Sequence, residues 1–157
     1  MKLKNLLIVV ENIEKSKEFY KELFGLNVVL DFGENVILTE GLVLQERKVW
    51  EHLIGKESSS GANDAELYFE ENNMDAFLDK LEKSKYEIDY INKCIERDWG
   101  QRVIRLYDLD KHVIEIGESM DFVARRYLNA GMSVEETAKK TRLPFLQVAE
   151  MKSYMEK

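Results

Sequence analysis

Apolar and polar positions follow the same order in two stretches of the chain. Residues 5–16 begin with a short apolar run, reach Asn12 and then change to a helical spacing of apolar positions. Residues 66–77 repeat this order around Asn73. An apolar run of this length indicates a strand, and Asn is a typical N-cap before an amphipathic helix. Each half of the chain is therefore predicted to begin with a strand followed by a helix.

The apolar stripes of the two predicted helices give a first set of core residues. Spacings of three and four place them on one face of each helix, and Gly25 is a stop signal for the first helix. The predicted buried positions are Ile13, Phe19, Tyr20 and Leu23 in the first helix and Met74, Phe77, Leu78 and Leu81 in the second.

Three β-like stretches follow each helix, separated by turns rich in Gly, Asn and Asp. Both halves are thus β-α-β-β-β units, and the predicted fold class is α+β. The predicted strands are 27–32, 35–39 and 41–47 in the first half, and 87–95, 101–107 and 112–117 in the second.

The rest of the chain divides into a linker and a helical extension. Residues 54–64 are polar and rich in Gly and Ser, which is typical of a linker. Ser133 and Glu136 form a capping-box pattern before a short helix, and Pro144 suits the first turn of a last helix. The predicted organisation is a first module at 1–53, the linker at 54–64, a second module at 65–119 and the extension at 120–157, which includes a helix at 121–130.

Composition narrows the class of protein. The 157 residues are 45% hydrophobic, with Lys+Arg 23 against Asp+Glu 30 and a net charge of −7. We expect a folded chain and no general nucleic-acid role, because the balance is acidic. We expect no membrane span and no signal peptide, since the apolar runs are short. The only cysteine, Cys94, allows no intrachain disulfide, and we expect a cytoplasmic protein.

Two segments resemble the vicinal oxygen chelate superfamily, which includes glyoxalase I, bleomycin- and fosfomycin-resistance proteins, methylmalonyl-CoA epimerase and extradiol dioxygenases. Residues 12–26 resemble its first-module helix, S-x-x-F-Y-x-x-x-x-G-L. Residues 99–115 resemble its closing hairpin, W-G-x-R followed by D-P-D-G-x-x-x-E, with Leu109 and Lys111 in place of Pro and Gly. The resemblance covers residues 3–118 and implies two modules whose sheets curl around one cavity.

Four positions of this superfamily project into the cavity and often bind a metal ion. The resemblance and strand alternation place Asn5, Gln45, Glu66 and Glu115 there. No histidine is among them, so the two-His, one-carboxylate site of an extradiol dioxygenase is excluded. Carboxylate and amide oxygens are suited to Mg²⁺ or Mn²⁺, and equally to a metal-free hydrogen-bonded cluster. No cofactor is firmly implied.

The two carboxylates leave the question of catalysis open. Glu66 and Glu115 are candidates for an acid–base pair of glyoxalase or epimerase type, because repulsion between close carboxylates raises one pKa. Alternatively, they pair with cavity arginines such as Arg105. Whether the protein is an enzyme is undecided from sequence; if it is, a glyoxalase-like lyase or an epimerase is indicated.

Apolar and aromatic residues are expected to line the cavity, which favours a small, partly aromatic ligand. His52 and His112 are expected on the surface, and Cys94 in the interior. The predicted ligand-binding residues are Leu7, Val9, Val43, Tyr68, Arg105, Tyr107, Trp50 and Trp99.

The extension resembles a helix-turn-helix in residues 131–152. In its second helix, only Gln147 and Lys152 could contact the edges of DNA bases, and the carboxylate of Glu150 would repel the DNA phosphates. We therefore favour packing on the domain or dimerisation over DNA binding, and a homodimer is expected. The leading prediction is small-molecule binding; a Mg- or Mn-assisted lyase or isomerase and a ligand-responsive DNA-binding regulator are the alternatives.

Overall fold

The computed structural model describes residues 1–155 of the chain. The first half contains β1 (Leu6–Val10), α1 (Ile13–Phe24), β2 (Val28–Asp31), β3 (Asn35–Leu38), the 3-10 turn η1 (Thr39–Gly41), β4 (Leu42–Glu46) and α2 (Arg47–Ile54). The second contains β5 (Glu66–Glu71), α3 (Met74–Glu82), β6 (Tyr90–Glu96), β7 (Arg102–Tyr107) and β8 (Val113–Glu118). The extension contains α4 (Met120–Asn129), α5 (Val134–Thr141) and α6 (Phe145–Met155).

The chain divides into two compact units. The first unit comprises residues 1–67, 83–89 and 107–113, so it holds the first sheet together with the turn between β7 and β8. The second unit comprises residues 68–82, 90–106 and 114–157.

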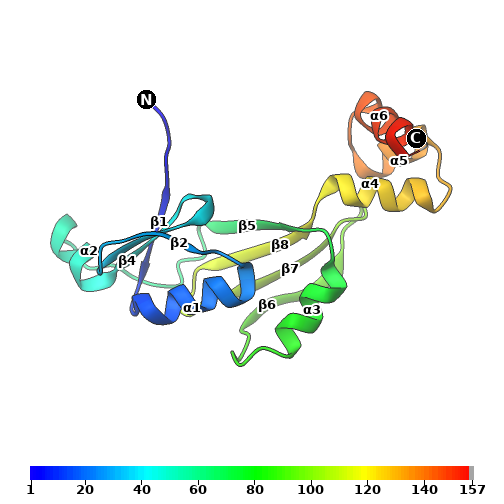
Figure 1. The fold of residues 1–157 in the computed structure, drawn as a ribbon. Helices are drawn as coiled ribbons and strands as arrows, with labels where there is room; N and C mark the ends of the chain where they lie inside the picture. Colours follow the sequence, from blue (N-terminus) through cyan, green and yellow to red (C-terminus); the bar gives the residue numbers. More distant parts are fainter. Residues whose placement is uncertain (156–157) are drawn as a thin grey trace. The chain divides into compact units, whose positions relative to one another are not determined.

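The first sheet has the strand order β1-β4-β3-β2, and β1 runs parallel to β4 (Figure 1). α1 packs against β4 because its apolar stripe is buried there, with Tyr20 and Leu23 almost inaccessible to solvent. Asn12 caps α1 by accepting from the Lys15 amide over 3.0 Å, and Gly25 ends it with a φ of 71°. The cap, the stripe and the stop all agree with the sequence prediction.

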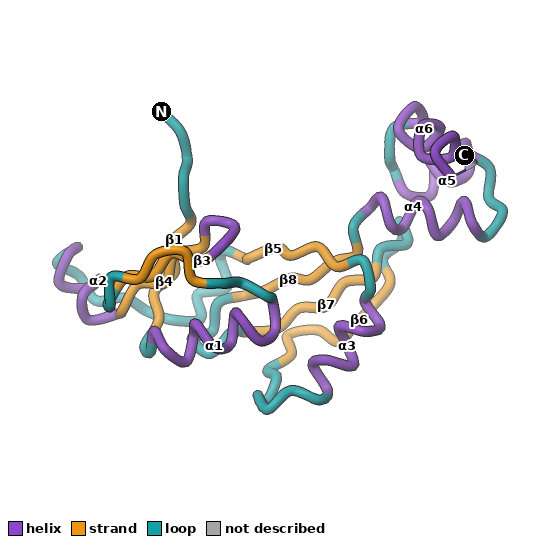
Figure 2. The backbone as a smooth tube through the Cα atoms, viewed as in Figure 1, coloured by secondary structure: helices purple, strands orange, loops and turns teal. Residues whose placement is uncertain are grey.

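The second sheet has the order β5-β8-β7-β6 (Figure 2). β6 and β7 pair antiparallel, with local shifts in register. α3 buries Met74, Phe77 and Leu81, three of the four predicted positions. The two β-α-β-β-β modules and the α+β class are therefore confirmed. The first strand after α3 begins at Tyr90 rather than at 87, because residues 83–89 belong to the other compact unit.

The three helices of the extension enclose a small core of their own. Ser133 and Glu136 form the predicted capping box at the start of α5. Arg142, in the turn between α5 and α6, lies over the Trp99 ring at 5.2 Å from its centroid, so the extension contacts the rest of the second unit. The buried core residues are Ala124, Leu128, Val148 and Met151, surrounded by Val134, Ala138, Leu143 and Met155.

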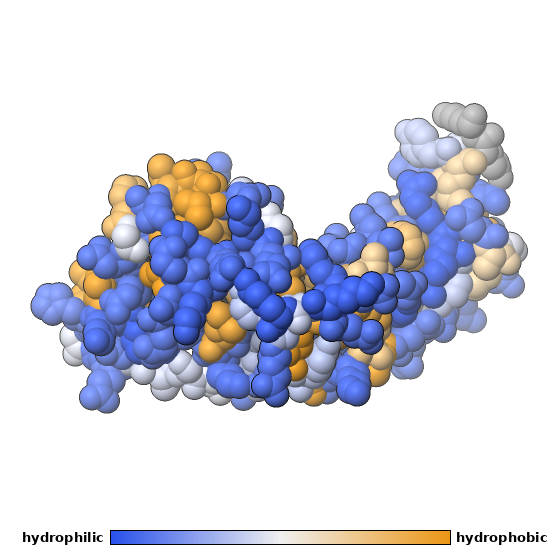
Figure 3. Space-filling model, turned by 60° about the horizontal axis from the view of Figure 1, so that its bottom comes forward, coloured by the Kyte–Doolittle hydropathy of each residue, from blue (hydrophilic) through white to orange (hydrophobic). Residues whose placement is uncertain are grey.

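The surface drawn in Figure 3 is mostly hydrophilic, and its apolar residues gather in separate patches. Across residues 1–155, the helices are all too short or too polar to cross a bilayer.

Candidate ligand-binding cavity

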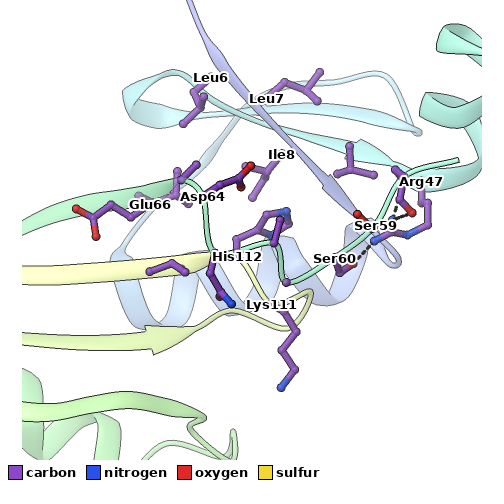
Figure 4. A pocket seen from close by; sticks show the side chains of 18 of the residues that line it. Leu6, Leu7, Ile8, Arg47, Ser59, Ser60, Asp64, Glu66, Lys111 and His112 are labelled. Atoms are coloured by element: carbon purple, nitrogen blue, oxygen red, sulfur yellow. Dashed lines mark hydrogen bonds between the residues drawn. The ribbon is translucent and has the colours of Figure 1, made fainter. Parts of the chain in front are cut away.

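The first unit contains a cavity of about 580 Å³ (Figure 4). Four segments form its walls: strand β1, the start of α2, the loop after that helix together with the first residues of β5, and the turn between β7 and β8. The lining residues include Leu6, Leu7, Ile8 and Val9 of β1, Arg47 and Trp50 of α2, residues 58–67, and Lys111, His112 and Val113.

The apolar wall comes from β1 and Trp50. Side chains of β1 alternate, so that Ile8 and Val10 are buried in the core while Leu7 and Val9 are half-buried. This alternation follows from the period of two in a strand. Leu7 and Val9 pair in register with Val43 and Gln45 of β4, which fixes the position of the wall.

Arg47 fastens the serine-rich loop to α2. Its Nη1 donates to the Ser58 carbonyl at 3.2 Å and to Ser58 Oγ at 2.7 Å, and its Nη2 donates to Ser60 Oγ at 2.5 Å (Figure 4). Its Nε donates to the Glu11 carboxylate. Glu51 accepts from the Ser58 amide and hydroxyl, both at 2.9 Å, which lowers the pKa of Glu51. The loop is therefore held in a defined position at the cavity wall.

Asp108 organises the turn between β7 and β8. Its Oδ1 accepts from the backbone amides of Asp110 and His112, at 2.9 and 2.8 Å. Its Oδ2 accepts from the Tyr20 hydroxyl at 2.7 Å and lies 2.8 Å from His112 Nδ1. Burial, followed by the charge of Asp108, holds the pKa of Tyr20 well above its usual value. This buried carboxylate connects α1 to the cavity-lining turn.

Lys111 adopts the backbone conformation that the superfamily pattern assigns to Gly. Its φ is 67°, in the left-handed region that L side chains seldom adopt. Its Nζ pairs with Asp89, and the ammonium lies 5.5 Å from the centroid of the Tyr107 ring. The replacement of Gly by Lys is thus accommodated with a side chain that lines the cavity.

Several residues predicted to bind ligand lie in or near this cavity. Leu7, Val9, Trp50 and Glu66 line it. Asn5 is exposed just before β1 and Val43 is buried on β4, while the Tyr107 hydroxyl donates to Asn63 Oδ1 over 2.6 Å. The predicted residues Arg105, Glu115, Tyr68 and Trp99 belong to the second unit.

In the second unit, Gln101 connects two of the predicted aromatic residues. Its Nε2 donates to the Tyr68 hydroxyl at 3.1 Å, and its Oε1 accepts from Trp99 Nε1 at 2.9 Å. Burial raises the pKa of Tyr68, and the nearby charges of Glu70 and Glu115 add to the effect. Gln101 was not predicted as a site residue, since the sequence pattern indicates only the first residue of the predicted strand at 101–107.

Two of the four predicted metal ligands, Gln45 and Glu115, have protein partners in this structure. Gln45 is buried, with its Oε1 accepting from Asn35 Nδ2 at 2.7 Å and its Nε2 donating to the Glu34 carbonyl at 2.9 Å. Glu115 forms an ion pair with Arg105, the partner that the sequence analysis named. Within residues 1–155, His, Cys, Asp and Glu side chains do not gather in threes as a metal site would need.

Two sequence expectations about single residues need correction. His112 was expected on the surface, but its ring is about a quarter exposed and is bonded to Asp108. Cys94 was expected in the interior, but it is only half-buried on β6, which still raises the pKa of its thiol. His52 is exposed on α2, as expected. The sequence feature that indicates the bond between His112 and Asp108 is their spacing of four residues across a tight turn.

Residues 3–121 match the family model of the glyoxalase-like domain. The "Uncharacterized protein YraH" of Bacillus subtilis (strain 168) is 29% identical over 131 residues, which cover 74% of this chain and 97% of that protein. A solved protein of unknown function from Agrobacterium tumefaciens str. C58 is 34% identical to this chain, with a TM-score of 0.64. The match covers 76% of this chain and 94% of the solved one.

A solved lactoylglutathione lyase from Agrobacterium tumefaciens is 17% identical, with a TM-score of 0.59, over 75% of this chain and 93% of that one. This likeness shows the shared fold alone. The family match ends at residue 121, at the first turn of α4, so most of the helical extension lies outside the matched domain.

Proposed function

This chain belongs to the family of glyoxalase-like domains, in the vicinal oxygen chelate superfamily, and we propose that it binds a small, partly aromatic molecule in the cavity of the first unit. The observation that carries the proposal is the composition of that cavity. An apolar wall from β1 and an indole ring from α2 face a polar loop and a turn that carries an imidazole.

The size of the cavity supports this class of ligand. Pockets for small molecules usually measure about 300–1,000 Å³ and combine apolar walls with a few polar groups that fix orientation. At about 580 Å³, the cavity is in this range. Trp50 supplies a flat surface on which an aromatic ring can stack.

The charges around the cavity favour a neutral ligand. The two cationic side chains that line it are already paired, Arg47 with Glu11 and Lys111 with Asp89. Asp64 and Glu66 also line the cavity and add negative charge. A strongly anionic ligand would therefore meet no uncompensated cation, whereas a neutral aromatic molecule would lose little hydration on entry.

Fluorescence quenching tests the proposal, because the chain has two tryptophans in different units. Trp50 lines the cavity and Trp99 belongs to the second unit. We expect 4-nitroanisole, a neutral nitroaromatic, to quench Trp50 emission saturably in the Trp99→Phe protein. The matched Trp50→Phe protein should show only weak, linear, collisional quenching. Equal saturable quenching in both variants would place the ligand elsewhere and contradict the proposal.

The remaining predictions of the sequence analysis stay predictions. These are a Mg- or Mn-assisted lyase or isomerase that uses Glu66 and Glu115, a regulator that binds DNA through the extension, and a homodimer. The geometry described above favours none of them over ligand binding in the first unit.

A further inference from the structure

His112 and Asp108 form a hydrogen-bonded pair at the wall of the cavity. The Nδ1 atom of His112 lies 2.8 Å from Asp108 Oδ2, and the Asp108 side chain is only 2% exposed. His112 itself lines the cavity. Backbone donors to the other oxygen, Asp108 Oδ1, hold the turn beside this pair.

The surroundings of Asp108 determine which ring nitrogen of His112 carries a proton. A carboxylate is an acceptor, so the short contact needs a proton on Nδ1. The Tyr20 hydroxyl and two backbone amides also donate to Asp108, so its two oxygens act as acceptors. The imidazole is therefore oriented with Nδ1 toward Asp108, and Nε2 is left to accept a proton.

The Nε2 atom of His112 has no protein partner within residues 1–155. The ring is held at one nitrogen by a buried carboxylate, and it lines the cavity together with the apolar residues of β1, the loop fastened by Arg47, and the carboxylates of Asp64 and Glu66. An oriented imidazole with a carboxylate behind it is the general arrangement by which proteins prepare a proton acceptor. Exposed His52, the only other histidine, has no such support.

We propose that His112, oriented by Asp108, accepts a proton from the hydroxyl of a phenolic ligand bound in the cavity of the first unit. This inference rests on the proposed function and names the chemical class of its ligand. A phenol combines a flat apolar ring for Trp50 and β1 with one weakly acidic donor for Nε2.

The proton transfer is balanced within the complex. The O–H bond of the phenol breaks, its electron pair stays on the phenolate oxygen, and an N–H bond forms at His112 Nε2. The imidazolium then lies between the phenolate and the Asp108 carboxylate, which stabilises its charge. No oxidant, reductant or further reactant is needed.

A coloured phenol makes the transfer visible. We would titrate the protein into 4-nitrophenol at a pH where the free phenol is mostly protonated, and follow the visible absorbance of the phenolate. The methyl ether 4-nitroanisole, which lacks the proton, is bound in parallel. Wild-type protein and the His52→Gln control should both develop the phenolate band. His112→Phe should bind 4-nitroanisole within about threefold of wild type and develop no band.

Other results are decisive as well. A phenolate band that persists in His112→Phe, or saturable binding of both probes to wild type without any band, overturns the role of His112 and leaves cavity binding standing. No saturable binding of either probe contradicts the proposed function and the inference together.

A second measurement uses the wild-type protein and therefore needs no variant. Nitrogen-15 NMR of the histidine rings in the wild-type protein should show His112 with a proton on Nδ1 and none on Nε2, and Nε2 should gain a proton when 4-nitrophenol is added. A resting His112 with its proton on Nε2 alone would overturn the inference.

Discussion

Arg126 of α4 donates from Nη2 to Oε2 of Glu118, at the end of β8, across 3.3 Å. Glu118 is completely buried, and Arg102 of β7 donates to its other oxygen from Nε and Nη2 at 2.9 and 2.8 Å. The same Arg126 nitrogen donates to the Gly100 carbonyl at 2.5 Å. A buried carboxylate thus connects the first helix of the extension to the second sheet.

Replacing Glu118 should destabilise the second unit strongly. Glu118→Gln leaves two arginines facing a neutral amide, and breaking a buried ion pair in this way costs about 3 kcal/mol of the free energy of unfolding. Arg126→Met should cost less, about 1 kcal/mol, because Arg102 still pairs with Glu118. Urea unfolding of both variants measures the difference. Equal losses for the two variants would contradict this assignment of the buried charge.

Gly100 should not tolerate a side chain. Its φ is 85°, and a Cβ atom there would overlap the phenol ring of Tyr127 in α4. We expect Gly100→Ala to cost about 2 kcal/mol or more, through both backbone strain and displacement of Tyr127. Thermal unfolding tests this, with Gly131→Ala as the control, because Gly131 also has a positive φ but no neighbour within 4 Å. Similar losses at both glycines would show that the Tyr127 contact is unimportant.

The main features of the fold could be predicted from the sequence because each rests on a local signal. Asn12, Gly25 and the apolar stripe between them define α1, and Ser133 with Glu136 defines the start of α5. The observed strand bounds differ from the predicted ones by a few residues, and the largest difference is at the start of β6. The segment just before β6, residues 83–89, belongs to the first unit and makes long-range contacts there, such as the ion pair of Lys85 with Glu18. Sequence patterns do not encode such contacts.

Four of the site residues predicted from the sequence, Leu7, Val9, Trp50 and Glu66, line the cavity of the first unit. Strand alternation predicted Leu7 and Val9 on one face of β1, because the period of two is a local property, and both line the cavity together with Leu6 and Ile8. The roles of Arg47 and His112 were missed, since each depends on a partner or a loop brought close by the tertiary fold. The pairing of Arg105 with Glu115 was anticipated only as one alternative.

Asp110 should make stability depend on pH in an unusual direction. Burial, with a contribution from Asp108, raises the pKa of Asp110 above 3.8, although the Glu11 amide donates to it over 2.9 Å. A raised pKa means that the folded state holds the proton more tightly than the unfolded state, so this stabilisation is present at low pH and is lost as pH rises through the folded pKa.

The variant Asp110→Asn removes that loss. At about pH 7, we expect the free energy of unfolding of the variant to exceed that of wild type by up to about 1 kcal/mol. At about pH 3, the two free energies of unfolding should be equal. Urea unfolding at both pH values measures this. A variant that is less stable than wild type at neutral pH would show that the carboxylate is needed for the turn.

The extension should not bind duplex DNA in a salt-dependent manner. The side chains that α6 exposes most include Phe145, Leu146 and Tyr154, together with Glu150, and offer little positive charge to phosphates. Fluorescence anisotropy with a labelled random duplex at low and high salt measures the affinity. Micromolar binding that weakens steeply with salt, and that Lys139→Ala reduces, would favour the regulator hypothesis instead.

Titration calorimetry with 4-nitroanisole tests the central claim, a neutral aromatic site in the first unit, most directly. Leu7 lines the cavity, whereas Leu53 of α2 is exposed and outside it, so Leu7→Asp and Leu53→Asp are matched substitutions. We predict saturable binding at about one molecule per chain to wild type and Leu53→Asp, and an affinity about tenfold or more lower in Leu7→Asp, because a charge then replaces the apolar wall. Equal affinity for all three proteins, or no saturable heat with wild type, would contradict the account.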